Sequence, residues 1–131
     1  VLIDGEPGGF GVVFADLPGC TAMGDTVEAA LQEAAEVAAE WMRLSESKGR
    51  PTPAPTSPEA LREMPDVRGA LREGAVLGSV VVVRESGRPV KANLSLDAGV
   101  LAAIDPTAQR LGLTRSGLIE LLARRNLQSL T

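Results

Sequence analysis

Three polar side chains near the end of the chain are spaced in a way that suits the reading of DNA bases. Lys91, Asn93 and Ser95 alternate with the apolar residues of the segment 90–96. In a β-strand this period of two places the polar side chains on one face and the apolar side chains on the other. Lys donates to guanine O6 and N7, Asn pairs with adenine N6 and N7, and Ser suits either base. The spacing therefore predicts a strand whose polar face contacts base edges.

A second candidate site lies at Thr114, Arg115 and Ser116, where a helix is predicted to begin. Thr is a favourable helix cap, and Leu118 starts the apolar side of the helix that follows. The free N–H groups and the positive dipole end of a helix bind anions, and Arg115 adds a positive charge. These three residues are therefore expected to clamp a phosphate of the DNA backbone.

The elements that must position these residues are a strand followed by two helices. After the strand at 90–96, apolar residues recur at helical spacing from Val100 to Leu111, and Gly112 is placed to end that helix. A unit of about 40 residues in this order cannot bury its own apolar faces, so it requires a second copy. Two such strands, paired about a twofold axis, make a ribbon that fits the major groove. The strand alone would also suit a solvated edge, but the order of the three elements favours the ribbon.

The preceding part of the chain has the pattern of a small antiparallel sheet packed on a long helix. Short apolar runs at 1–3, 11–14 and 20–23 are separated by loops rich in Gly and Pro, which predicts a meander of three strands. Asp25 is positioned to cap a helix reaching about Lys48, with Glu28 at the capping-box spacing. The apolar stripe of this helix, expected to pack on the sheet, comprises Val27, Leu31, Ala34, Ala38, Trp41 and Met42.

Three further segments complete this part of the chain. Residues 52–57 form a Pro-rich loop, and the residues that follow predict a short helix over 58–63. The run 75–83 is almost continuously apolar, which favours a central buried strand over an exposed edge. The charged, Gly-containing segment 84–88 then breaks the pattern, so the sequence predicts two domains, 1–88 and 89–131.

The two predicted domains differ in the sign of their charge. Residues 1–88 carry 14 acidic and 8 basic side chains, a net charge of −6, whereas residues 89–131 carry 3 acidic and 5 basic side chains, a net charge of +2. An acidic body and a basic tail suit two different partners. A difference of two charges over the short second domain would also arise by chance, so charge alone does not identify either partner.

Composition argues against several classes of protein. Histidine is absent and Cys20 is the single cysteine, so neither a zinc site nor an intrachain disulfide is expected, and no cofactor is predicted. No run of about 18 apolar residues could span a membrane, and a reducing cytoplasm is the expected location. Cys20 could be a redox sensor, but no cationic residue lies within four positions of it, which favours a small packed side chain.

An enzyme is the rival class, because clustered carboxylates can hold magnesium for the hydrolysis of nucleic acid. The candidate cluster would be Asp4, Glu6, Asp16 and Asp25. Each of these acids has a structural reason for its position, in a loop, a turn or a helix cap. The sequence therefore predicts a binding protein without catalytic residues.

Two stretches of the chain resemble known families. The segment 90–96 with Ile104-Asp105 and Leu113-Thr114-Arg115-Ser116 resembles the ribbon-helix-helix family, whose base-reading positions fall on Lys91, Asn93 and Ser95. The segments Gly8 to Cys20, which ends in Asp-Leu-Pro-Gly-Cys, Gly24 to Leu31, and the loop Gly49 to Pro55 resemble the HicB antitoxin family. The second resemblance runs across nearly the whole chain. Some HicB proteins end in a helix-turn-helix module instead, but the strict alternation at 90–96 favours the ribbon.

The resemblance implies an α+β protein with two domains. The first would be a degraded RNase H-like domain, an antiparallel sheet plus a long helix, that binds and inhibits a HicA-type mRNA interferase toxin. The second would be a ribbon-helix-helix domain that dimerises, possibly to a tetramer, and represses the protein's own operon by binding operator DNA. Exposed acids are the candidate toxin contacts, namely Asp16, Glu33, Glu36 and Glu40. The alternative left open is a stand-alone repressor whose first domain senses a ligand or another protein.

Overall fold

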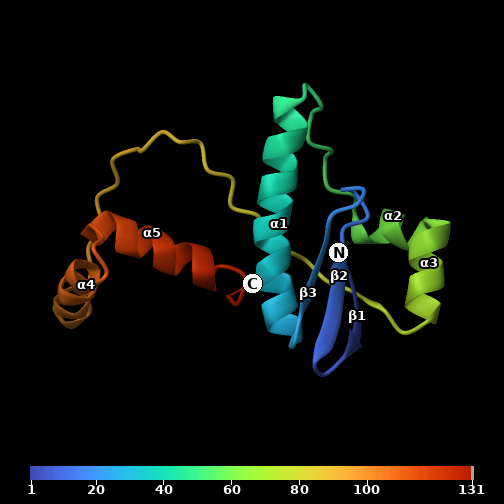
Figure 1. Cartoon of the computed structure of the whole chain (residues 1–131), viewed down its shortest axis with the longest axis horizontal. Helices are drawn as coiled ribbons and strands as arrows, with labels where there is room; N and C mark the ends of the chain where they lie inside the picture. Colours follow the sequence, from blue (N-terminus) through green and yellow to red (C-terminus); the bar gives the residue numbers. More distant parts are fainter. Residues whose placement is uncertain (131) are drawn as a thin grey trace. The chain divides into compact units, whose positions relative to one another are not determined.

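The computed structural model describes residues 1–130 and divides the chain into two units, Val1–Val83 and Arg84–Thr131 (Figure 1). The division falls five residues before the break predicted after Arg88, because the apolar run that ends at Val83 packs within the first unit. The first unit combines a sheet with three helices, and the second contains two helices.

A four-stranded antiparallel sheet forms the centre of the first unit. Its strands are β1 (Leu2–Glu6), β2 (Gly9–Val13), β3 (Thr21–Gly24) and β4 (Val76–Leu77), in the order β3-β2-β1-β4. The predicted meander of the first three strands is confirmed. The predicted loop at 4–9 is too long, because β1 continues to Glu6 and pairs with β2 up to Gly9. Gly5 permits this, since its φ is +113° and a Cβ there would lie 2.2 Å from the carbonyl oxygen of Gly9.

The long helix α1 (Val27–Ser47) covers one face of the sheet, as its apolar stripe predicts. The predicted cap is wrong by one residue: the hydroxyl of Thr26, and not the carboxylate of Asp25, accepts a hydrogen bond from the N–H of Ala29 at 3.1 Å. The backbone carbonyl of Asp25 instead accepts a bond from the N–H of Gly8, at 2.9 Å. The start of the helix is therefore tied to the turn between β1 and β2.

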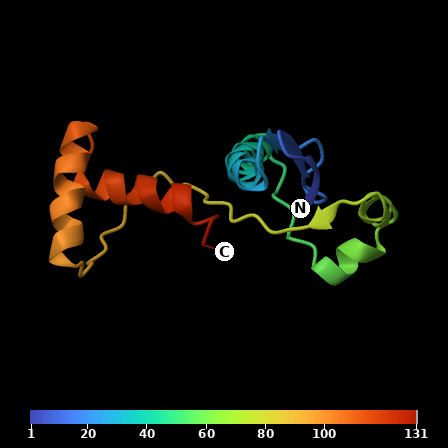
Figure 2. The ribbon, with the colours of Figure 1, turned by 90° about the horizontal axis from the view of Figure 1, so that it is seen from below.

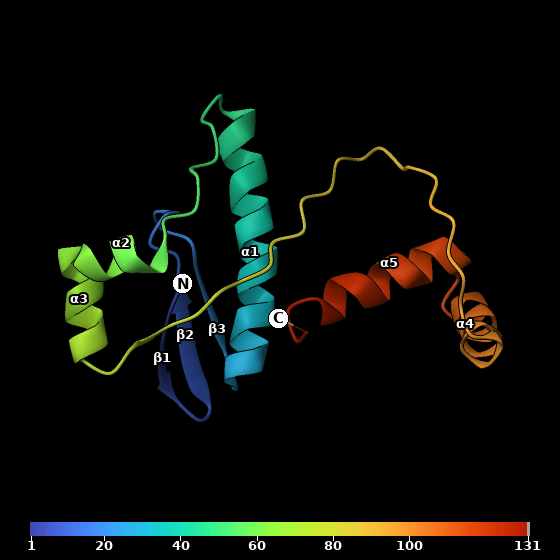
Figure 3. The same ribbon diagram turned by 180° about the vertical axis from the view of Figure 1, so that it is seen from behind.

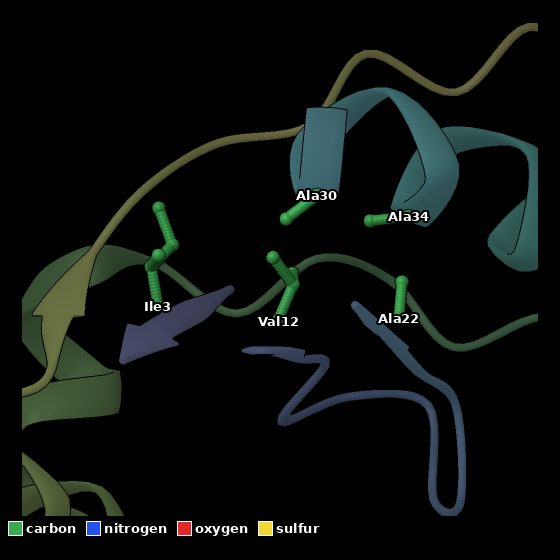
Figure 4. Packing of buried hydrophobic residues seen from close by; sticks show 5 residues of the cluster. All are labelled: Ile3, Val12, Ala22, Ala30 and Ala34. Atoms are coloured by element: carbon green, nitrogen blue, oxygen red, sulfur yellow. The ribbon is translucent and has the colours of Figure 1, made fainter. Parts of the chain in front are cut away.

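Small side chains dominate the core between α1 and the sheet. Figure 4 shows Ile3, Val12 and Ala22 directed toward Ala30 and Ala34 of the helix. Val27, predicted to be buried, is 39% exposed, whereas Ala30 is fully buried although it was not predicted. The difference has a physical reason. Alanines four residues apart let the helix approach the strands closely, so the face of the helix that carries them packs on the sheet. The larger apolar side chains indicate a neighbouring face instead. A second cluster holds Leu17, Cys20 and Ala38.

The apolar run 75–83 does not form the central strand that its composition predicts. Only Val76–Leu77 pairs with the sheet, as the edge strand β4, and Val76 is 56% exposed. Residues 78–83 continue without regular structure, and the segment passes toward α1 (Figure 3). Its apolar side chains are used in another way: Val80 packs against the core of Ile3 and Val12, and Val82 packs against the second cluster.

Two short helices precede this run. The first, α2 (Pro58–Glu63), confirms the predicted helix, and its cap is the hydroxyl of Ser57. The second, α3 (Pro65–Arg72), was not predicted. Leu61 of α2 and Val67 of α3 are buried, so the pair forms a small packed corner of the first unit.

The second unit consists of α4 (Ala98–Arg110) and α5 (Arg115–Asn126), which lie across each other in Figure 2. Both predicted helices are confirmed, with Gly112 at a φ of +68° after the first and Thr114 as the cap of the second. In the single chain, residues 84–97 form neither helix nor strand. The strand predicted at 90–96 is therefore not formed in the single chain, because the described residues of the second unit provide only helices and no strand with which it could pair.

Candidate functional site

The segment 90–96 exposes both of its faces in the single chain. Lys91, Asn93 and Ser95 are exposed, as a reading face requires. The apolar positions between them are exposed too: Val90 is 88% exposed and Leu94 is 62% exposed. An alternating row of exposed aliphatic side chains is unfavourable in water.

The helices of the second unit add to this uncovered apolar surface. Ala108 of α4 and Leu118 of α5 are the buried residues of the two helices. Their larger apolar neighbours stay at the surface, with exposures between 38% and 54%, namely Val100, Leu111, Leu113 and Leu122. The second unit therefore buries only a small core of its own.

The start of α5 has the predicted cap together with an ion pair that the sequence does not reveal. Thr114 accepts a hydrogen bond from the N–H of Gly117 at 3.0 Å, and Ser116 is exposed beside it. Arg115 donates two hydrogen bonds to the carboxylate of Asp105 in α4, through Nε at 2.8 Å and Nη2 at 2.7 Å. The hydrogen bond to Arg115 lowers the pKa of Asp105, and the same contact raises the pKa of Arg115. Arg115 therefore joins the two helices. If it also binds a phosphate as predicted, its guanidinium has to contact the phosphate and Asp105 at the same time.

Three of the four acids predicted to contact a partner lie on α1. Glu33, Glu36 and Glu40 are exposed, at the spacing of three and four residues that places them along one side of the helix. Glu40 accepts two hydrogen bonds from Arg43, at 2.8 and 2.6 Å, and this pairing lowers the pKa of Glu40. The side of the helix that carries these acids is thus available to a partner.

The fourth acid, Asp16, has a different setting. Its carboxylate accepts hydrogen bonds from the backbone N–H of Thr56, at 2.9 Å, and from the Thr56 hydroxyl, at 2.5 Å. The group is partly buried and holds the Pro-rich loop against the turn after β2. No sequence pattern signals a bond between residues 40 apart, so this structural role was missed.

A partly exposed apolar surface that the sequence did not predict lies beside the acids of α1. Val37, Trp41 and Leu44, which we call the Trp41 patch, line a shallow depression together with Glu36 and Glu40. Trp41 was predicted to be wholly part of the buried stripe, but it is half-buried, and its indole N–H donates to the carbonyl of Pro18 at 3.1 Å. This bond fixes the ring at the surface of the helix.

The described residues offer little for metal or thiol chemistry. Among residues 1–130, no three His, Cys, Asp or Glu side chains lie close enough together to hold a metal ion, so the acids considered for an enzyme do not gather. Cys20 is 1% exposed, and burial raises the pKa of its thiol, which disfavours the reactive thiolate. Within the same residues, no helix combines the length and the apolar character needed to cross a membrane.

The fold defines an α+β protein with a four-stranded antiparallel sheet, in which an acidic first unit precedes a basic two-helix unit. The family model for the HicB-like antitoxin of bacterial toxin-antitoxin systems matches residues 1–123. The chain therefore belongs to the HicB-like antitoxin family, and a toxin is a plausible partner.

Two solved structures have a similar fold over nearly the whole chain. One is the crystal structure of the Burkholderia pseudomallei antitoxin HicB, whose sequence is 26% identical to this chain. The match has a TM-score of 0.54 and covers 99% of this chain and 96% of the HicB chain. The other is the crystal structure of the antitoxin HicB3, whose sequence is 30% identical to this chain. The match has a TM-score of 0.52 and covers 95% of this chain and 93% of the HicB3 chain. No curated protein matches the chain.

Proposed function

We propose that this antitoxin binds and inhibits a HicA-type mRNA interferase through residues 1–88 and represses its own operon through residues 89–131. The first domain would be a degraded RNase H-like unit, and the second a ribbon-helix-helix unit. Both partners, toxin and operator DNA, would be met in the cytoplasm. The single observation that carries the DNA-binding part is the exposed alternating segment 90–96 directly before two helices.

The apolar face of this segment supports pairing with a second copy. Val90, Leu94 and Leu96 share one face and are exposed by 88%, 62% and 42%. Antiparallel pairing with the same segment of another chain would give the backbone N–H and C=O groups hydrogen-bond partners. It would also pack these side chains against the helices of both copies. The exposed apolar residues of α4 and α5 provide the surface to receive them. We infer a dimer built through this unit, from which a tetramer could form through other surfaces.

The opposite face of the ribbon would then carry two copies of Lys91, Asn93 and Ser95. These side chains would enter the major groove, with Asn93 reading adenine and Lys91 reading guanine. The start of α5, at Thr114 and Ser116, would bind a backbone phosphate through its N–H groups. In Arg115 the ion pair uses Nε and Nη2, so Nη1 would be the atom directed to that phosphate.

Charge supports the assignment of the toxin to the first unit. Residues 1–83 carry 13 acidic and 6 basic side chains, a net charge of −7. A protein that cuts RNA has to attract a phosphate backbone and presents basic side chains, to which an acidic surface is complementary. The antitoxin would inhibit by covering that basic surface.

Co-expression with a HicA-type toxin encoded beside the gene tests the inhibitory function. We expect the toxin alone to arrest growth, the pair to grow normally, and the two proteins to purify together. Continued arrest in the presence of the full antitoxin chain, with no toxin in the purified material, would contradict the proposal. Growth with a toxin already inactivated at its active site provides the control for expression load.

A further inference from the structure

The Trp41 patch is an apolar feature on the surface of α1. Trp41 and Leu44 take part in two depressions, one shared with Glu36 and Glu40 and the other with Pro18, Lys48 and Pro51. Leu44 is 42% exposed, and Trp41 is held in place by its bond to Pro18. An indole fixed at the surface costs little entropy to order further, which is why Trp is enriched at the energetic centres of protein interfaces.

The surroundings of the patch indicate the chemistry of its partner. Glu33, Glu36 and Glu40 run alongside Val37, Trp41 and Leu44 over three turns of the helix. An apolar strip with a parallel row of carboxylates fits a partner that presents an apolar side chain flanked by Lys or Arg. A second copy of the first unit is the poorer occupant, because it would bring a net charge of −7 against another −7.

We propose that the Trp41 patch is the docking site for the toxin on this antitoxin. The inference rests on the proposed function and adds the location of the contact. Trp41 and Leu44 would receive an apolar side chain of the toxin at the centre of the interface, and Glu36 and Glu40 would pair with basic side chains at its rim. Asp16 would contribute by holding the loop that borders Pro18, without touching the toxin itself.

Binding measurements on the full chain test this location. In Leu44→Arg, a long charged side chain replaces an exposed leucine, and we expect the toxin to bind at least about 30-fold more weakly, as at the centre of an interface. Glu36→Lys at the rim is expected to weaken binding about 5-fold, mainly through the association rate and less at high salt. The matched control is Met23→Arg, because Met23 is 71% exposed and lies on the sheet face opposite to the buried Ala22. It is expected to bind within about twofold of the wild type.

A spectroscopic readout checks the contact directly, because Trp41 is the only tryptophan in the chain. Antitoxin labelled with 5-fluorotryptophan should give one fluorine resonance, which shifts and loses its sensitivity to exchange of water for heavy water when unlabelled toxin is added. The same resonance in Leu44→Arg without toxin shows whether the variant keeps its fold.

Each outcome decides a different question. If Leu44→Arg and Met23→Arg both bind the toxin as the wild type does, the docking site is wrong and the proposed function stands. If the wild type does not bind the toxin, both fail. If Leu44→Arg lowers the mass of the free antitoxin in light scattering, a second copy covers the patch, and the inference is overturned.

Discussion

Asp16 joins two distant parts of the first unit through one side chain. Its two carboxylate oxygens bind the backbone and the hydroxyl of Thr56, which fastens the Pro-rich loop beside the turn that leads to Cys20. Proline has no backbone N–H, so a Pro-rich loop has few hydrogen-bond donors with which it can be held in place. The N–H of Thr56 is one of them. The carboxylate is thus better explained by stability than by recognition.

Asp16→Ala should lower the free energy of unfolding of the first unit by about 2 kcal/mol, because it removes two hydrogen bonds to a charged acceptor and leaves the Thr56 N–H without its partner. Thr56→Val, which keeps the backbone bond, should cost about 1 kcal/mol. Urea unfolding followed by the fluorescence of Trp41 reports this unit. Glu33→Ala is the control for loss of an acid, and a stability for Asp16→Ala equal to that control would refute the structural role.

Asp105 and Arg115 make the stability of the second unit depend on pH. The pKa of Asp105 is lowered by its hydrogen bonds to Arg115. The ionised carboxylate therefore stabilises the fold fully at pH values above the ordinary pKa of Asp. This stabilisation is lost as pH falls through the lowered pKa. Amide signals of α4 and α5 during heating should show Asp105→Asn melting below the wild type at about pH 7 and together with it at about pH 2. A difference that persists in acid would have another cause.

Local sequence patterns predict the settings of some residues and leave others undetermined. Thr114 as a cap, Gly112 as a helix end and the exposure of Asn93 follow from local rules, and the structure agrees with them. The bonds of Asp16 to Thr56 and of Arg115 to Asp105 join residues 40 and 10 apart. Such pairs depend on how elements cross, which no local pattern contains.

Among the contacts between the sheet and the helices, the one between β3 and the start of α1 is close at Gly24. A Cβ added at Gly24 would lie 2.4 Å from the backbone N of Ala30 and 2.9 Å from the carbonyl carbon of Ala29. Backbone atoms of a helix cannot give way as a side chain can. The strand and the start of the helix therefore depend on glycine at this position.

Gly24→Ala should destabilise the first unit by about 2 to 3 kcal/mol, since the helix has to move away from the sheet. Gly9→Ala is a matched control in the neighbouring strand, because a Cβ there meets nothing within 4 Å. It should change stability by less than about 1 kcal/mol. Urea unfolding of both variants measures the contrast, and equal losses would show that the close approach is not limiting.

The element whose state depends on a second chain is the segment 90–96. Leu94→Lys would place a charge on the proposed apolar face of the ribbon and should convert the protein to a smaller species in sedimentation velocity. Asn93→Ala, on the other face, should keep the wild-type mass. Retention of the full mass by Leu94→Lys would show that the copies associate elsewhere.

Helices were predicted well where a helical period was strong, whereas the two strands predicted at 75–83 and 90–96 are not formed as predicted in the single chain. The stripe of α1 and the periods of α4 and α5 gave helices with nearly correct bounds. The run 75–83 is apolar without a period, and hydrophobicity alone cannot distinguish a central strand from an irregular segment that packs Val80 and Val82 against a core. The helix α3 was missed because Pro65 follows α2 so closely.

At the scale of the whole molecule, the chain combines two units of opposite charge. Residues 1–83 have a net charge of −7, and residues 84–131, with seven basic and four acidic side chains, have a net charge of +3. In the proposed function the acidic unit binds a basic toxin and the basic unit binds DNA. Because the two units are separate, a substitution in one unit would weaken the binding of its partner and leave the binding of the other partner unchanged.

The most direct test is the fluorescence anisotropy of labelled promoter DNA from the protein's own operon, titrated with the full chain and compared with a scrambled sequence of equal length. We expect the promoter to bind at least about 1,000-fold more tightly than the scrambled DNA, and Asn93→Ala to weaken promoter binding by about 10-fold or more while toxin binding is unchanged. Equal binding of the two sequences by the wild type, or an unaltered preference in Asn93→Ala, would contradict base reading by the exposed face of the segment 90–96.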